Sequence, residues 1–275
     1  MSESTSISES PVTLTSKGTR AIRIARLTWH VLQATVSAAI VFPFLSIAER
    51  RVRVRRFAQG LLHILAVRLT VSGTPPRADQ APAMLVANHV SWLDIFAIDA
   101  AHVVRFVAKS EIRRWPVIGW LCAQGGTLFI ERTQRKHTLN INEQIAAGLR
   151  AGDLFAVFPE GIISSGDVVL PFHASLLQSA LSCNALLFPV AIRYTGADGE
   201  LCYAAHYAGT RTLVESLRLI LTQPVIRVHL RFLPPIVCAG RHRRELADEA
   251  GAVIAAALNL PAPRRHTQKA SHPLV

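Results

Sequence analysis

Residues 83–94 read AMLVANHVSWLD, and this stretch decides the fold. Its first five residues are all apolar, which predicts a strand buried on both faces, as in a parallel sheet. Ser91 and Asp94 have the spacing of a helix start, in which a hydroxyl and an acidic group satisfy free backbone N–H groups. A buried strand that leads into a helix is typical of α/β domains. We therefore expect His89 at the strand end where such folds place their chemistry.

The rest of the chain repeats this alternation of short apolar runs and helical patterns. Residues 68–260 are therefore predicted to form an α/β domain with a mixed, largely parallel sheet flanked by helices. Strands are expected near residues 67–72, 83–87, 103–108, 127–131, 154–158, 186–191 and 225–232, and helices near 91–101, 138–150, 173–182, 211–222 and 242–258.

The two ends of the chain differ from this domain. Residues 1–19 are rich in Ser and Thr and are predicted to be a disordered tail, and residues 261–275 a flexible basic tail. Residues 20–67 are predicted to be a membrane-anchoring helical segment, because 28–48 carry no formal charge and would reach roughly 30 Å as a helix. Basic flanks on both sides favour an in-plane or re-entrant anchor, with 57–67 as its partner. A true span and a buried soluble helix are the alternatives.

The composition indicates the kind of partner. Half of the 275 residues are hydrophobic, and the formal net charge is +12. A chain that is both apolar and basic favours an anionic membrane surface. No nucleic-acid-binding motif is present, so we expect no nucleic-acid partner. The four cysteines are scattered, and we expect no metal site.

The pair formed by His89 and Asp94 has two interpretations. A histidine can accept and return a proton near neutral pH, and a carboxylate can orient it, which makes the pair a candidate general base. In the other interpretation, Asp94 only begins the helix and His89 has no chemical role. Taken alone, the pair favours this second interpretation.

Two further segments also place polar residues at predicted strand ends. Residues 125–132 read GGTLFIER and deliver Arg132, which can bind a phosphate through two donors. Residues 158–161 read FPEG, and Glu160 directly follows a buried strand, where a carboxylate must be exposed or paired. Taken alone, each segment can also be an ordinary strand end or turn.

Together and in this order, these segments resemble the glycerolipid acyltransferase family, which includes 1-acylglycerol-3-phosphate and lyso-ornithine lipid acyltransferases. The resemblance covers about residues 65–235. Its motifs lie at residues 88–94, 126–132, 158–161 and 188–191. It implies transfer of a fatty acyl group from acyl-CoA or acyl-ACP to the free hydroxyl of a membrane lysolipid, without a bound cofactor. The most direct acceptor is 1-acyl-sn-glycerol-3-phosphate, which gives phosphatidic acid.

The resemblance also implies roles for individual residues. His89 would deprotonate the acceptor hydroxyl, and Asp94 would orient His89 and stabilise its imidazolium. The implied substrate-binding residues are Gly126 and Arg132 for the phosphate or head group, Glu160 and Gly161 for the acceptor pocket, and Lys109 for additional positive charge. The implied location is the cytoplasmic face of the cell membrane.

One departure from the family pattern affects the acceptor. Many members continue with Thr-Arg-Ser after Pro-Glu-Gly, whereas this chain has Ile162, Ile163 and Ser164. The missing arginine makes a lyso-ornithine lipid the alternative acceptor. Two functions of different classes also fit parts of the sequence: a serine hydrolase that uses Ser91, although no Gly-x-Ser-x-Gly surrounds it, and a non-catalytic lipid-binding protein.

Overall fold

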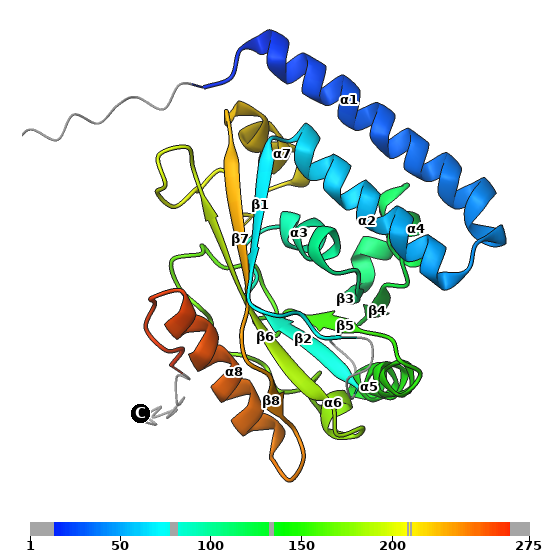
Figure 1. Ribbon diagram of the computed structural model, residues 1–275, viewed down its shortest axis with the longest axis vertical. Helices are drawn as coiled ribbons and strands as arrows, with labels where there is room; N and C mark the ends of the chain where they lie inside the picture. The colour runs from blue at the N-terminus through cyan, green and yellow to red at the C-terminus, as the bar shows by residue number, and fades with distance from the viewer. Residues whose placement is uncertain (1–13, 78–81, 132–134, 208, 210, 265–275) are drawn as a thin grey trace, which may run out of the picture.

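The computed structural model describes residues 14–77, 82–131, 135–207, 209 and 211–264. These residues form an eight-stranded sheet with helices on both faces (Figure 1). The order is β1-β7-β6-β2-β5-β3-β4, and β8 pairs with β6. The strands are β1 (Val67–Ser72), β2 (Ala83–Ala87), β3 (Arg105–Lys109), β4 (Leu128–Ile130), β5 (Phe155–Val157), β6 (Leu186–Thr195), β7 (Ile226–Phe232) and β8 (Ile236–Val237).

The predicted mixed, largely parallel sheet is confirmed. Strands β6, β2, β5, β3 and β4 run parallel to one another, whereas β7 and β8 are antiparallel to β6, and β1 is parallel to β7. The carboxyl ends of the five parallel strands therefore share one edge of the sheet. β2 is the fourth of the seven strands in the order above, so the segment that follows it begins near the centre of the sheet.

Two apolar layers enclose the sheet, as the uninterrupted apolar sequence of β2 requires. Ala83, Leu85 and Ala87 join the cluster on one face, and Met84 and Val86 join the cluster on the other. The first face is covered by α2 (Ile47–Ile64), α3 (Leu93–Ala101) and α7 (Leu213–Thr222), and the second by α5 (Arg135–Arg150), α6 (Gln178–Leu181) and α8 (Arg243–Ala257).

The N-terminal segment forms a helical hairpin over the first face. Helix α1 (Lys17–Val36) continues through a π turn (Ser37–Val41) and a 3-10 turn (Phe42–Phe44) before the chain reverses into α2. The His30 ring stacks on Phe57 with 4.8 Å between centroids, and its Nε2 lies 2.9 Å from the Phe57 carbonyl oxygen. A Cβ on Gly60 would lie 2.5 Å from this ring, so glycine permits the close approach.

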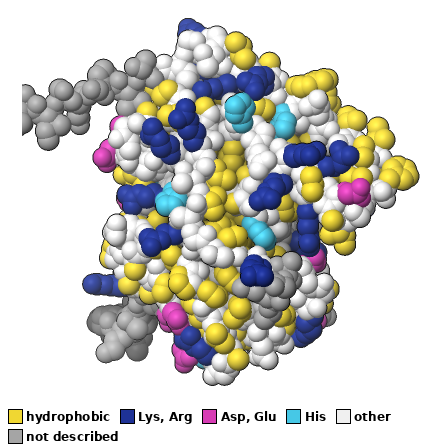
Figure 2. All heavy atoms as spheres, in the orientation of Figure 1, with side chains coloured by type: hydrophobic (Ala, Val, Ile, Leu, Met, Phe, Trp, Pro, Cys, Tyr) yellow, Lys and Arg dark blue, Asp and Glu magenta, His cyan; other side chains and the backbone are white. Residues whose placement is uncertain are grey.

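The outer surface of the hairpin is apolar and exposed. None of the α1 side chains is buried, and the stretch Lys17–Phe44 is long and apolar enough to cross a membrane. Hydrophobic and basic side chains lie side by side over the end where α1 turns into α2 (Figure 2). The exposed apolar residues include Ile22, Trp29, Leu32, Ile40, Phe44 and Ile47.

Some element bounds differ from those predicted. Helix α1 begins at Lys17, inside the predicted tail. The helix predicted for residues 173–182 is reduced to α6, because tertiary hydrogen bonds engage its first part: the His173 N–H donates to Pro159, and the Ser175 carbonyl accepts from Asn142. Helix α4 (Ile118–Gln124) and strand β8 were not predicted, since both are too short to show a clear period.

Candidate active site

Asn88 connects the end of β2 to β6. Its Nδ2 donates to the Ile192 carbonyl at 3.0 Å, and its Oδ1 accepts from the Ile192 N–H at 2.8 Å. The side-chain amide thus makes the two hydrogen bonds to β6 that the backbone would make if β2 continued, and the chain can leave the sheet here. His89 is thereby placed in the loop directly at the carboxyl edge.

His89 and Asp94 meet across the bend between strand and helix. Their Nδ1 and Oδ2 atoms lie 2.7 Å apart. Asp94 is in the first turn of α3 and fully buried, whereas the His89 side chain is 18% exposed. Because the carboxylate accepts at Nδ1, the neutral ring carries its lone pair on Nε2, which is the arrangement that a general base requires.

Three further groups donate to the Asp94 carboxylate. The N–H groups of Val90 and Ser91 reach Oδ2 at 2.8 and 3.0 Å, and the Tyr194 hydroxyl reaches Oδ1 at 2.8 Å. Burial and the neighbouring Asp94 charge raise the pKa of the Tyr194 phenol, so the hydroxyl stays protonated and donates. The carboxylate is therefore fixed in one orientation before any substrate binds.

The helix start and the histidine pair coexist in this structure. Ser91 donates its N–H to Asp94, as expected for a helix start, and its Oγ accepts from the Leu93 N–H at 3.3 Å. Ser91 is fully buried. A buried hydroxyl held at the start of a helix is poorly placed to attack an ester, which argues against a serine hydrolase.

Residues 158–164 hold the His89 backbone from both sides. Glu160 Oε1 accepts from the His89 N–H at 2.9 Å, and the Ser164 N–H donates to the His89 carbonyl at 2.7 Å. The Phe158 ring stacks on the imidazole with 4.1 Å between centroids. The Pro-Glu-Gly segment thus positions the histidine.

Glu160 is buried, which changes its protonation. Burial raises the pKa of its carboxyl to about 8, although hydrogen bonds from the N–H groups of His89 and Leu170 act in the opposite direction. The side chain is therefore mainly neutral at pH 7. A neutral carboxyl can hold the His89 backbone without adding a second negative charge beside Asp94.

Gly161 ends a turn directly after Glu160. Gly161 has a φ of 77°, which favours glycine, and its N–H donates to the Phe158 carbonyl at 3.2 Å. Ile162 is 60% exposed, and Ile163 is half-buried. Ile163, which stands where many family members have the arginine, directly precedes Ser164, whose N–H donates to the His89 carbonyl.

Gly126 does not lie with His89. Its carbonyl accepts from Arg105 Nε at 2.9 Å, and Arg105 is in register with Phe155, which pairs with Met84. Gly126 therefore lies level with Met84 along the strand direction. Met84 is five residues before His89, so Gly126 and His89 are roughly 16 Å apart along the strands. Gly126, with a φ of 81°, instead forms the turn that begins β4.

Lys109 does reach the His89 edge. It ends β3, is exposed, and pairs with Ile130 at the end of β4. β4 also ends at this edge, and Glu131 follows it. Arg132 itself lies outside the described residues. Among the residues that the structure describes, no group of three or more His, Cys, Asp or Glu could hold a metal ion.

Sequence reasoning assigned no individual role to four residues of the site: Asn88, Phe158, Ser164 and Tyr194. Tyr194 left a usable signal, because the hydroxyl of a tyrosine buried in a mostly apolar strand must find a partner. Nothing in the sequence showed that this partner would be Asp94, one hundred residues earlier.

Comparison with known proteins identifies the family. The acyltransferase family model matches residues 68–193. The lyso-ornithine lipid O-acyltransferase of Pseudomonas aeruginosa is 34% identical over 254 residues, which cover 92% of this chain and 95% of that protein. The chain belongs to the acyltransferase family. The predicted resemblance and enzyme class are thereby confirmed.

A second relative and a solved structure are also similar to this chain. The 1-acyl-sn-glycerol-3-phosphate acyltransferase of Neisseria meningitidis serogroup B is 39% identical over 160 residues, which cover 58% of this chain and 62% of that protein. The crystal structure of the 1-acyl-sn-glycerophosphate acyltransferase from Thermotoga maritima has a TM-score of 0.64 and 22% identity, and the match covers 87% of this chain and 96% of that one. The acyltransferase shares that fold.

Proposed function

We propose that this acyltransferase moves a fatty acyl group from an acyl thioester directly to the free hydroxyl of a lysolipid. The observation that carries the proposal is the 2.7 Å contact between His89 Nδ1 and the buried Asp94 carboxylate. His89 Nε2 takes the hydroxyl proton as the oxygen attacks the thioester carbonyl. The thiolate then leaves and takes that proton, so the imidazole returns to its neutral form. Asp94 stabilises the imidazolium between these steps.

Replacement of the base tests this mechanism. His89→Ala should abolish acyl transfer while thermal unfolding stays near that of the wild type. His63→Ala, at the exposed end of α2, is the matched control and should keep full activity. A His89→Ala variant that kept most of its activity would contradict the proposed chemistry.

The proposed acceptor is 1-acyl-sn-glycerol-3-phosphate. Lys109 lies at the His89 edge, and Arg132 comes two residues after the end of β4 in the sequence, so we expect both cations to bind its phosphate. Gly126 contributes by starting β4, and Glu160 and Gly161 by shaping the loop around His89. Arg132→Gln should raise the KM for a phosphate-bearing acceptor and leave the KM for the donor unchanged.

A lyso-ornithine lipid is the second candidate, and Ile163 favours it. The missing arginine removes a phosphate ligand beside Ser164, and an exposed Ile162 suits a less charged head group. The relative that matches over 92% of the chain is a lyso-ornithine lipid acyltransferase. Purified protein offered a labelled acyl thioester with both lysolipids decides between them, because only one product should form efficiently.

We also propose that residues 20–67 anchor the acyltransferase at the cytoplasmic face of the cell membrane. The exposed apolar surface of α1 and the adjacent arginines support this anchor. Acceptor and product are both lipids, and extraction of a chain into water costs about 0.8 kcal/mol per CH₂. An enzyme held at the membrane surface avoids this cost, because neither lipid has to leave the membrane. The acyl donor, acyl-CoA or acyl-ACP, reaches the site from the aqueous side.

A further inference from the structure

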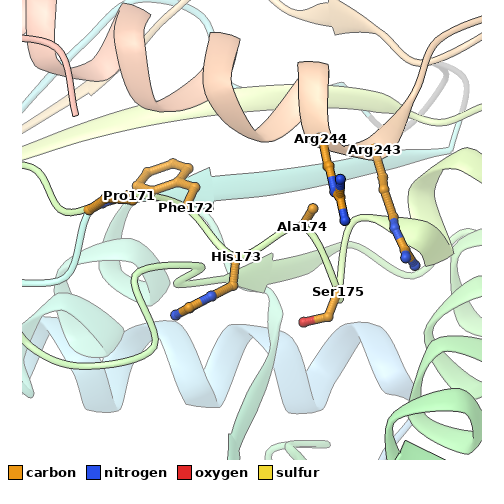
Figure 3. A pocket seen from close by; sticks show the side chains of 7 residues that line it. All are labelled: Pro171, Phe172, His173, Ala174, Ser175, Arg243 and Arg244. Carbon is orange, nitrogen blue, oxygen red and sulfur yellow. The ribbon is translucent and has the colours of Figure 1, made fainter. Parts of the chain in front are cut away.

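A basic cavity lies on the face of the sheet opposite to the helical hairpin. It has a volume of about 420 Å³ and is lined by residues 171–175 and by Arg243 and Arg244. Figure 3 shows both arginines projecting from the first turn of α8 toward the segment that carries Ala174 and Ser175. His173 belongs to the same lining.

Fold stability does not explain these two arginines. Positive charges in the first turn of a helix oppose the helix dipole, so their placement costs free energy. Among the described residues, neither guanidinium has a carboxylate within ion-pair distance. Two acidic groups of the same helix have other partners: Glu245 accepts from the His242 N–H, and Glu249 pairs with Arg241 at 2.6 Å. Two guanidiniums beside a cavity fit an anionic ligand, and guanidinium forks suit phosphate oxygens.

The cavity is connected to the active site through a short segment of chain. The His173 N–H donates to the Pro159 carbonyl at 2.8 Å, and the next residue, Glu160, accepts from the His89 N–H at 2.9 Å. These contacts place the His173 backbone roughly 10 Å from that of His89. Arg243 and Arg244 face Ala174 and Ser175, the two residues that follow His173 (Figure 3).

This separation distinguishes between the two substrates. The reacting hydroxyl and the phosphate of a 1-acylglycerol phosphate sit on adjacent carbons, roughly 5 Å apart, so an acceptor phosphate stays beside His89. A pantetheine thioester has thirteen bonds between sulfur and phosphorus, which is roughly 15 Å when extended. Only the donor can place its sulfur at His89 and its phosphate in the cavity.

We propose that the cavity formed by residues 171–175, Arg243 and Arg244 binds the phosphate end of the pantetheine-linked acyl donor. This inference rests on the proposed acyl transfer and assigns the donor side of the same site. The phosphate can come from the nucleotide end of coenzyme A or from the phosphodiester of a carrier protein, because both carry the same pantetheine arm.

The test compares Arg243→Gln/Arg244→Gln with Arg68→Gln/Arg231→Gln, which removes two exposed arginines from strands β1 and β7. With acyl-CoA, the cavity variant should show a KM raised about tenfold or more at unchanged kcat. With S-acyl pantetheine, which has no phosphate, its KM should equal that of the wild type. The KM for the lysolipid should not change, and the control should behave as the wild type.

The carrier protein forms a second arm of the experiment. A raised KM for both acyl-CoA and acyl-ACP assigns the cavity to the shared phosphate, and a raised KM for one donor alone assigns it to that donor. An unchanged KM for both donors overturns the proposal. So does an equal rise with S-acyl pantetheine, or a rise in the lysolipid KM.

Calorimetric titration with free coenzyme A keeps this result separate from the proposed function. Wild-type protein that transfers no acyl group to either lysolipid refutes the proposed function. Coenzyme A that binds the wild type and the control but not the cavity variant still supports the phosphate site. Equal binding of coenzyme A to all three proteins refutes the phosphate site. If coenzyme A binds none of them, the KM for acyl-ACP decides, and an unchanged KM in the cavity variant refutes the site.

Discussion

Asparagine in place of Asp94 separates the charge of the carboxylate from the hydrogen bonds that it accepts. Oδ2 accepts from three N–H groups, those of the His89 ring, Val90 and Ser91, whereas Oδ1 accepts from the Tyr194 hydroxyl. An amide oxygen will therefore take the Oδ2 position, and its NH₂ group will face the tyrosine oxygen, which can accept. Asp94→Asn should thus keep the fold and the ring orientation while removing the negative charge.

The expected loss follows from the ion pair in the transition state. Imidazolium and carboxylate centres roughly 4 Å apart, at an effective dielectric constant of about 20, attract one another by about 4 kcal/mol. A barrier higher by this amount lowers kcat by about a thousandfold. The loss should stay below that of His89→Ala, because the base and its tautomer remain.

The assay is single-turnover acyl transfer from a labelled thioester, with urea unfolding on the same proteins. His89→Ala/Asp94→Asn should be no slower than His89→Ala alone, since Asp94 acts through the ring. An Asp94→Asn variant that lost stability but kept its rate within about threefold would show that Asp94 only begins the helix. A double variant much slower than His89→Ala would also refute the coupling.

Three further predictions concern stability and membrane binding. Tyr194→Phe should lower the free energy of unfolding by about 1.5–3 kcal/mol, because it removes a buried hydrogen bond to a charged group, and urea titration measures this loss. Burial raises the pKa of Glu160 to about 8, so the folded protein holds a proton that the unfolded chain releases above its ordinary value of 4.5. Stability should therefore fall as the pH rises from 5 to 8, by up to about 1.4 kcal/mol per pH unit, and Glu160→Gln should flatten this slope; an equally steep slope in the variant would assign it to other groups. Phe44 is 86% exposed at the hairpin end, and Phe44→Ser should weaken binding to anionic vesicles by about tenfold or more in sedimentation assays. Leu139→Ser, on α5, is the control, and equal binding by both variants would contradict the proposed anchor.

The segment 83–94 shows how much of the site is local. An uninterrupted apolar run predicted β2, and the spacing of Ser91 and Asp94 predicted the start of α3 to within two residues. The bend between them made the contact of His89 with Asp94 predictable. These properties depend on hydrophobic period and on hydrogen bonds between residues close in sequence, which a single sequence displays directly.

Other parts of the site could not be predicted from local pattern. Gly126 and Arg132 belong to one motif, but β4 separates them in the sequence. Gly126 precedes β4 and therefore lies at the end of the strand that is far from His89. The helix expected from residue 173 begins only at Gln178, because Pro159 and Asn142 engage the preceding backbone. Contacts of this kind depend on which strands become neighbours.

The sequence by itself determined the alternation of strands and helices, the position of the histidine pair and the family. Only the tertiary structure decided that the Tyr194 hydroxyl donates a hydrogen bond to Asp94 and that Glu160 holds the His89 backbone as a mainly neutral group. It also decided that residues 171–175 line a cavity together with Arg243 and Arg244. The physical reason is the pairing of β2 with β5 and β6. These pairings join segments about seventy and one hundred residues apart, and no local period encodes them.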